Sequence, residues 1–134
     1  MLHRRWNRNK EVQRYIKNKI DLELDRIYPV SGECRYNFRC HLNSVHEAVK
    51  NNDEYIIMGF YFCNNQPIIH FYNYQKGVII DNTLGCHALQ YKHYIYKRVY
   101  KKDFKNIETV FLNFRKQIRN SLPWYLRIFS TYNC

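Results

Sequence analysis

Residues 55–81 read YIIMGFYFCNNQPIIHFYNYQKGVIID, and this stretch predicts three consecutive strands. Residues 55–63, 68–74 and 78–81 are rich in aromatic and β-branched side chains, which are typical of strands. The segments between them, Asn64-Asn65-Gln66-Pro67 and Gln75-Lys76-Gly77, contain the residue types that favour turns. The stretch therefore predicts an antiparallel sheet built from two successive hairpins.

The length of each turn decides which side chains of this sheet face each other. A two-residue first turn puts Gly59 opposite His70, and a glycine there would leave room for a thiolate or a substrate. The second turn leaves three registers open. In the first register Asp81 lies directly opposite His70, and in the second it lies diagonal to His70. In the third, which has a three-residue turn with a bulge, Asn82 lies opposite His70.

The residues before the sheet predict two helices. Residues 10–27 carry apolar side chains at spacings of three and four, and residues 28–39 contain turn signals. Residues 41–51 predict a second helix, with one apolar face formed by Leu42, Val45, Ala48 and Val49.

A strand at about residues 91–100 and a helix at residues 103–119 are expected after the sheet, with Asp103 as the helix cap. An apolar tail follows at residues 123–129. The order of helix, helix, strands and helix is an α+β pattern, and 134 residues fit a single domain.

Cys40 is the candidate nucleophile, because it lies at the start of the second helix, roughly opposite the apolar face. A helix N-terminus lowers the pKa of a thiol, and its free N–H groups can stabilise an oxyanion. A nucleophilic cysteine also needs a base. His70 is the best candidate, since it is a polar residue within an apolar strand, and either Asp81 or Asn82 could orient its ring.

The order of these residues resembles the papain-like and transglutaminase-like superfamily of cysteine enzymes, in particular small phage-borne or bacterial members. The resemblance covers residues 36–84 and rests on four short segments: Cys40-His41-Leu42-Asn43, Gly59-Phe60, His70-Phe71-Tyr72 and Asp81-Asn82-Thr83. Phe71 and Tyr72 stand where many relatives have a tryptophan. The resemblance implies a papain-like core, with helices packed on an antiparallel sheet.

The resemblance also implies the roles of the site residues. Cys40 would be the nucleophile, His70 the general base and Asp81 the residue that orients His70, with no cofactor and no metal. Asn43 could support the site, and Tyr36 and Asn37 lie at about the right distance before Cys40 to supply an oxyanion donor.

The single domain, residues 1–134, is then expected to have three parts. These are an amphipathic helix within residues 1–28, a catalytic core at residues 36–84, and a strand plus helix at residues 91–134. The expected function is that of a hydrolase or acyltransferase of the protease, amidase or deamidase type. It would act on an amide, isopeptide or thioester bond of a protein or peptide, as a host-directed phage effector.

The charge distribution supports a different function class. The formal net charge is +11, and the basic residues are concentrated at residues 1–39 and 91–134, while the middle is slightly acidic. Such flanks could bind nucleic acid or an acidic partner. The alternative prediction is therefore a nucleic-acid-binding protein, or an inhibitor that binds a host protein, on a catalytically inactive papain-like scaffold.

The remaining cysteines and histidines carry weaker signals. The five cysteines include no Cys-x-x-Cys pair, and Cys34, Cys40, Cys86 and His87 do not have the spacing of a common zinc site. His41, His46, His87 and His93 are interpreted as structural or surface residues. The odd cysteine number, the lack of a long apolar run and the lack of a signal-like N-terminus predict a cytoplasmic protein, in the host cytoplasm if phage-encoded.

Overall fold

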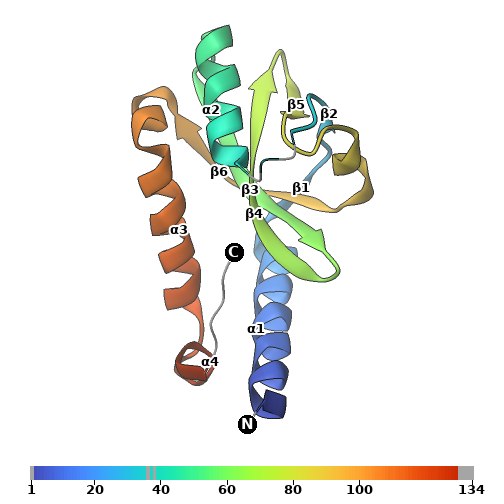
Figure 1. Cartoon of the computed structure of the whole chain (residues 1–134), viewed down its shortest axis with the longest axis vertical. Helices are drawn as coiled ribbons and strands as arrows, with labels where there is room; N and C mark the ends of the chain where they lie inside the picture. Colours follow the sequence, from blue (N-terminus) through green and yellow to red (C-terminus); the bar gives the residue numbers. More distant parts are fainter. Residues whose placement is uncertain (1, 36, 38, 130–134) are drawn as a thin grey trace.

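The computed structural model describes the backbone of residues 2–35, 37 and 39–129, and the side chains of residues 10–35, 37 and 39–126. These residues form a six-stranded mixed sheet with four α-helices, which confirms the α+β class (Figure 1). In chain order the elements are α1 (Leu2–Glu23), β1 (Asp25–Ile27), β2 (Val30–Ser31), α2 (Cys40–Asn51), β3 (Tyr55–Cys63), β4 (Gln66–Gln75), β5 (Val78–Asp81), the 3-10 helix η1 (Gly85–Gln90), β6 (His93–Tyr100), the 3-10 helix η2 (Lys101–Asn106), α3 (Ile107–Ser121) and α4 (Trp124–Phe129).

The strand order in the sheet is β1-β6-β3-β4-β5-β2, and all neighbours are antiparallel except β2 and β5. Alternate side chains of each strand point to opposite faces. One face packs against the helices and forms the main core, which includes Val12, Ile16, Ala48, Ile56, Met58, Phe60, Ile69, Phe71, Phe114 and Ile118. The other face carries a smaller cluster around Ile27, Ile57 and Tyr72.

The two central hairpins follow the predicted pattern closely. β3 and β5 have the expected bounds, whereas β4 starts at Gln66, because only Asn64 and Asn65 form the first turn. Both asparagines have positive φ values, 50° and 65°, as two-residue hairpin turns with a right-handed twist require. Gly59 pairs with His70, as predicted for a turn of this length.

The second hairpin settles which of the three predicted registers occurs. Its turn is formed by Lys76 and Gly77, both with positive φ, and Gln75 pairs with Val78. This is the register in which Asp81 is diagonal to His70. The register that would have placed Asn82 opposite His70 is therefore wrong.

The first and last predicted helices differ from the structure at their ends. The first helix was expected to extend to residue 27, but α1 ends at Glu23, because residues 25–27 form β1 and pair with β6. The N-terminal part, residues 1–28, thus contains a strand as well as a helix. Asp103 does not cap α3, since it lies within η2, and the residue that precedes α3 is Asn106.

Helix α2 buries a face that overlaps only in part with the predicted apolar one: Ala48 is buried, and Leu42 and Val45 pack half-buried against the main core. Its buried residues are Cys40, His41, Asn43, Ser44, Glu47 and Ala48, most of which are polar. Val49, on the apolar face, is 62% exposed. The polar face is buried because the neighbouring strands offer hydrogen-bond partners to it, as described below.

The chain ends in a partly exposed tail. Leu126 of α4 is buried in the main core, whereas Trp124 and Tyr125 are exposed. Among the helices of the described residues, none has the length and apolar character needed to cross a membrane.

Candidate active site

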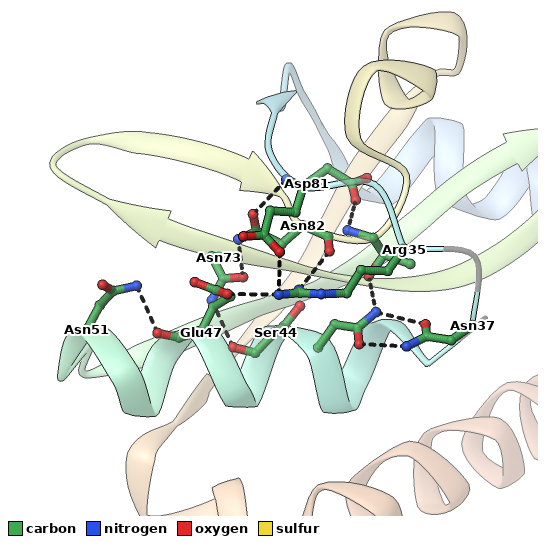
Figure 2. Close-up of polar contacts among 11 residues, drawn as sticks. Arg35, Asn37, Ser44, Glu47, Asn51, Asn73, Asp81 and Asn82 are labelled. Atoms are coloured by element: carbon green, nitrogen blue, oxygen red, sulfur yellow. Dashed lines mark hydrogen bonds and ion pairs between the residues drawn. The ribbon is translucent and has the colours of Figure 1, made fainter.

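A buried polar network fixes helix α2 against strands β4 and β5 (Figure 2). Asn73 of β4 is fully buried, and its Nδ2 donates to the carbonyl oxygen of Ser44 at 2.8 Å. Asn82 Nδ2 donates to Asn73 Oδ1 at 2.8 Å, and Asn82 Oδ1 accepts the backbone N–H of Glu33. These groups are paired with each other, which offsets most of the cost of burying the polar face of α2, and Ser44 Oγ is the one buried polar side-chain atom among the described residues without a hydrogen-bond partner.

Arg35 forms the second part of this network. Its Nη2 lies 2.9 Å from Glu47 Oε1 of α2, and its Nη1 donates to the carbonyl oxygen of Asn82 (Figure 2). The Arg35 hydrogen bond is the main cause that holds the pKa of Glu47 below its ordinary value, against the opposing effect of burial. The guanidinium thus joins α2 to the end of β5.

The loop that leads into α2 is held by a pair of asparagines. Asn37 and Asn43 exchange side-chain hydrogen bonds of 3.0 and 3.1 Å, and Asn37 Oδ1 also accepts the N–H of Arg39. Asn43 Nδ2 reaches Thr83 Oγ1 at 3.0 Å. The carboxamides of Asn37 and Asn43 therefore order the start of α2, and Asn43 joins it to Thr83. The other predicted donor, Tyr36, lies outside the described residues.

Cys40 lies against the part of β4 that β5 does not cover. The pairs between β4 and β5 run only from Asn73 to Gln75, which leaves the edge of β4 at Ile69 and His70 open to α2. The Cys40 thiol lies 4.0 Å from the carbonyl oxygen of Ile69, and the residue is 8% exposed. The first turn of α2 therefore brings the thiol to the strand that carries His70.

Cys40, His70 and Asp81 lie in one buried cluster. His70 Nε2 lies 2.8 Å from Asp81 Oδ2, and the charge of His70 acts on the nearby Cys40 thiol. Burial alone would raise the pKa of Cys40, but the positive charge of His70 and hydrogen bonds from His41 and His70 outweigh it and lower this pKa to about 6. Burial opposes the charged form of His70 as well, yet the Cys40 and Asp81 partners raise its pKa to about 9.

Asp81 is fully buried and uses both carboxylate oxygens. Oδ1 accepts the backbone N–H groups of Thr83 and Leu84 at 3.0 and 2.8 Å, which leaves Oδ2 for His70. Although burial opposes ionisation, the hydrogen bond and charge of His70 and the two N–H donors lower the pKa of Asp81. Asp81 is therefore the hydrogen-bond partner of His70, while Asn82 belongs to the network around α2.

Aromatic side chains hold the His70 ring from two sides. Tyr61 and Tyr72 each meet it edge-on, with ring centroids 5.0 and 4.9 Å away. The Tyr72 hydroxyl lies 2.6 Å from His93 Nδ1, and His93 Nε2 lies 2.6 Å from the carbonyl oxygen of Ala88. Burial lowers the pKa of His93, which suits a neutral ring that donates to Ala88 and accepts from Tyr72. His93 is thus structural, as predicted.

Gly59 does not provide space for a thiolate or a substrate. A β-bulge in β6 shifts its pairing with β3 between Met58 and Gly59. The carbonyl oxygen of Tyr94 then occupies the place where a Cβ on Gly59 would lie. The glycine is therefore required by the close approach of two backbones, and its predicted role at the site is wrong.

His41, interpreted from the sequence as structural or surface, is buried beside α3. It follows Cys40 in α2, and its Nε2 lies 2.9 Å from Glu108 Oε1 of α3. Its ring stacks on Phe111 at 5.0 Å with an interplanar angle of 4°. Adjacency to Cys40 was visible in the sequence, but the partner carboxylate comes from a helix 67 residues later.

The other described cysteines and the surface grooves lie apart from this cluster. Cys34 and Cys86 are exposed and Cys63 is half-buried, all three as free thiols. Within the described residues, no group of His, Cys, Asp and Glu has a metal-binding arrangement. Two grooves, one between α1 and α3 and one between α2 and η2, are lined by residues other than Cys40, His70 and Asp81.

The cluster offers an ionisable thiol at a helix N-terminus, a histidine beside it and a buried carboxylate behind that histidine. Those are the groups needed for nucleophilic attack on a carbonyl carbon. Comparison of the chain with protein-family models, with curated proteins and with solved structures finds no match.

Proposed function

We propose that the protein is a cysteine-dependent hydrolase or acyltransferase that uses Cys40, His70 and Asp81. The observation that carries the proposal is the buried pair of His70 Nε2 and Asp81 Oδ2, 2.8 Å apart, close enough to the Cys40 thiol for the charge of His70 to lower the pKa of that thiol. A thiol whose pKa is lowered to about 6 is mostly a thiolate at neutral pH. The substrate class is an amide, isopeptide or thioester of a protein or peptide.

In the proposed mechanism, the Cys40 thiolate attacks the carbonyl carbon and forms a carbon–sulfur bond, while the carbonyl electron pair moves to oxygen. The free N–H groups at the start of α2 stabilise this oxyanion. Protonated His70 then gives its proton to the leaving nitrogen or sulfur, and the bond to the leaving group breaks. The product of this half-reaction is a thioester on Cys40.

In the second half, neutral His70 takes a proton from water or from an acceptor amine as that group attacks the thioester. Collapse of the second tetrahedral intermediate releases the acyl product and returns the Cys40 thiolate with protonated His70. Asp81 stays ionised throughout and keeps the ring in one orientation, as in other nucleophile, histidine and acid arrangements.

The arrangement supports a papain-like architecture as the finer description of the fold. The nucleophile lies at a helix start, and the histidine and its acid lie on consecutive antiparallel strands. We assign the protein to a reducing compartment such as the cytoplasm, because the thiol must stay reduced to react and the described cysteines are free.

A simple acyl donor tests the proposal without knowledge of the natural substrate. With p-nitrophenyl acetate, we expect p-nitrophenolate release and an acetylated Cys40 that peptide mass spectrometry locates. Cys40→Ser should abolish the acetylation, and His70→Ala should slow it by about 10²–10⁴-fold, the usual contribution of a general base.

Cys63→Ser is the matched control, since Cys63 is a half-buried free thiol outside the cluster. It should retain the full rate. A Cys40→Ser variant that folds and releases p-nitrophenolate at the unchanged rate would show that the thiol is not the nucleophile.

A second candidate function, binding of nucleic acid through the basic flanks, is favoured by one surface. The groove between α2 and η2 is lined by Val45, Val49 and Phe104 together with Lys101, Lys102 and Lys105. The three lysines are exposed, so they could neutralise phosphates.

Fluorescence anisotropy with a labelled single-stranded DNA tests this second function at several salt concentrations. We expect affinity that falls steeply with salt and that is reduced when Lys101, Lys102 and Lys105 are replaced by glutamate. Lys76→Glu, in the exposed turn between β4 and β5, serves as the control. An anisotropy that does not change at low salt would exclude this function.

A further inference from the structure

Two exposed cysteines lie on segments that pack together beside the turn that holds Asp81. Cys34 follows β2, and Cys86 lies in η1, and both are free thiols. Although these segments are far apart in the sequence, β2 and η1 pack against each other (Figure 1). Neither thiol takes part in the proposed reaction of Cys40.

Backbone contacts place Cys34 against the residues that immediately precede Cys86. Cys34 forms an isolated antiparallel bridge with Leu84. The N–H group of Arg35 donates to the carbonyl oxygen of Thr83 at 2.8 Å. The loop that contains Cys34 is therefore held along the short stretch of chain that leads into Cys86.

Gly85 allows this approach to be unusually close. Its φ is +57°, and a Cβ on it would lie only 2.8 Å from Cys34 Cβ and 3.1 Å from Cys34 Cα. Since consecutive Cα atoms are about 3.8 Å apart, the Cα atoms of Cys34 and Cys86 are separated by at most about 8.5 Å. Disulfides join Cα atoms about 4.4–6.8 Å apart, so a small adjustment at most brings the two thiols into bonding range.

We propose that Cys34 and Cys86 form a modification site, at which a low-molecular-weight disulfide such as oxidised glutathione converts the two thiols into a reversible disulfide. This inference goes beyond the proposed function and does not depend on it, because Cys40 takes no part in the exchange. The ring that the new bond closes nevertheless includes Cys40, His70 and Asp81.

The reaction consists of two thiol–disulfide exchanges. The thiolate of one cysteine attacks a sulfur of oxidised glutathione, which forms a mixed disulfide and releases one glutathione thiolate. The thiolate of the other cysteine attacks the protein sulfur of this mixed disulfide, forms the bond between Cys34 and Cys86, and releases the second glutathione. The protein loses two electrons and two thiol protons, and oxidised glutathione takes them up as two glutathione thiols.

The bond would reinforce the turn around Asp81. Thr83 and Leu84 donate their N–H groups to Asp81 Oδ1, and the N–H group of Gly32 donates to the carbonyl oxygen of Asp81 at 3.0 Å. A covalent link between the same two segments should slow their local opening, so the amide protons of Thr83 and Leu84 should exchange more slowly in the oxidised protein. Its urea midpoint should rise, because the ring restricts the unfolded chain.

Peptide mapping in glutathione buffers of increasing oxidised fraction tests the inference. Trypsin places Cys34 in residues 27–35 and Cys86 in residues 77–92, and each of these peptides contains one cysteine. Without reduction, we expect these two peptides to appear linked to each other as the main disulfide. In Cys34→Ser and Cys86→Ser the link should be absent, and the remaining thiol should carry glutathione instead.

A pair of glycine variants tests the geometry itself. Gly85 and Gly77 both have positive φ values, 57° and 79°, but a Cβ on Gly77 would meet nothing within 4 Å. We expect Gly85→Ala to lower the equilibrium constant for disulfide formation by about tenfold or more, because a distorted disulfide is easier to reduce. Gly77→Ala is the matched control and should titrate like the wild type.

The outcomes separate this inference from the proposed function. The link should form in Cys40→Ser as it does in the wild type, whatever the acyl-donor assay shows for Cys40. If Cys34 and Cys86 of the wild type stay reduced or carry only glutathione in fully oxidised buffer, the modification site is refuted and the proposed function is untouched. A linked protein whose Thr83 and Leu84 amides exchange as fast as in the reduced form would refute the effect on the turn.

Discussion

Asp81 Oδ2 lies 2.8 Å from His70 Nε2 across a diagonal between β4 and β5. The two-residue turn at Lys76 and Gly77 fixes this diagonal, because it sets the register of the hairpin. The other oxygen of the carboxylate is held by the N–H groups of Thr83 and Leu84. The orientation of the His70 ring is therefore determined by backbone geometry on both sides of Asp81.

Asp81→Asn should reduce the reactivity of Cys40. The amide can still accept the two backbone N–H groups, but it carries no negative charge, so the pKa of His70 should fall and less thiolate should form. We expect slower alkylation of Cys40 at pH 6 and a His70 titration midpoint by NMR below the wild-type value. Asp53→Asn, which changes a half-buried aspartate hydrogen-bonded to Gln75, should leave both quantities unchanged. An unchanged His70 midpoint in Asp81→Asn would contradict the assigned role.

The stability of the wild-type protein should be nearly independent of pH between about 6.5 and 9 as far as Cys40 and His70 are concerned. In the folded state the pKa of Cys40 is about 6 and that of His70 about 9, against ordinary values of 9.0 and 6.5. The folded pair then holds its one proton on His70, and the unfolded pair holds it on Cys40. Because the pair binds the same number of protons in the folded and the unfolded state, it makes no contribution to the pH dependence of the free energy of unfolding in this range. Urea unfolding at several pH values measures this.

Cys40→Ser should lower the pKa of His70. The charge of the Cys40 thiolate is the largest of the causes that raise this pKa, and only the hydrogen bond and charge of Asp81 remain to oppose burial when it is lost. We expect the His70 titration midpoint by NMR to fall below that of the wild type. Cys63→Ser, which changes a half-buried free thiol outside the cluster, should leave the midpoint unchanged. An unchanged midpoint in Cys40→Ser would argue against the ion pair.

Asn73→Ala should destabilise the packing of α2 on the sheet. The side chain is fully buried and joins Ser44 to Asn82, so its loss leaves the Asn82 Nδ2 group without a partner and the Ser44 carbonyl oxygen with only its bond inside the helix. Buried groups left unsatisfied cost about 1–3 kcal/mol each. Asn51→Ala is the control, because Asn51 donates to the carbonyl oxygen of Glu47 from an exposed position. Equal urea midpoints for the two variants would contradict the importance of the buried network.

Gly59→Ala should destabilise the protein far more than Gly77→Ala. A Cβ on Gly59 would overlap the carbonyl oxygen of Tyr94, which is backbone and cannot move without breaking the β3–β6 pairing. Gly77 has open space around it and a φ of +79°, so an alanine there costs only the left-handed conformation, about 1–2 kcal/mol. Thermal unfolding of both variants measures the difference. A smaller loss for Gly59→Ala would refute the close approach of the strands.

The α+β class, the central hairpins and the pairing of Gly59 with His70 could be predicted from the sequence alone. Those features depend on the residue types in the turns and on the alternation of side chains along each strand, and both can be seen in residues that are adjacent in the sequence. The sequence also pointed to Cys40, because a helix start can be recognised from its neighbours. It left open whether Asp81 or Asn82 faces His70, since turn residues at 75–77 are compatible with more than one register.

The rest of the cluster depends on tertiary packing. The polar face of α2 is buried because Arg35 and Asn73 come from two different segments to pair with it, and Asn82 from a third segment pairs with Asn73. No helical periodicity reveals these partners. His41 has a carboxylate partner because α3 brings Glu108 from 67 residues away. Hydrogen bonds between distant segments depend on how the elements pack together, and for this reason the pair of His41 and Glu108 becomes visible only in the folded chain.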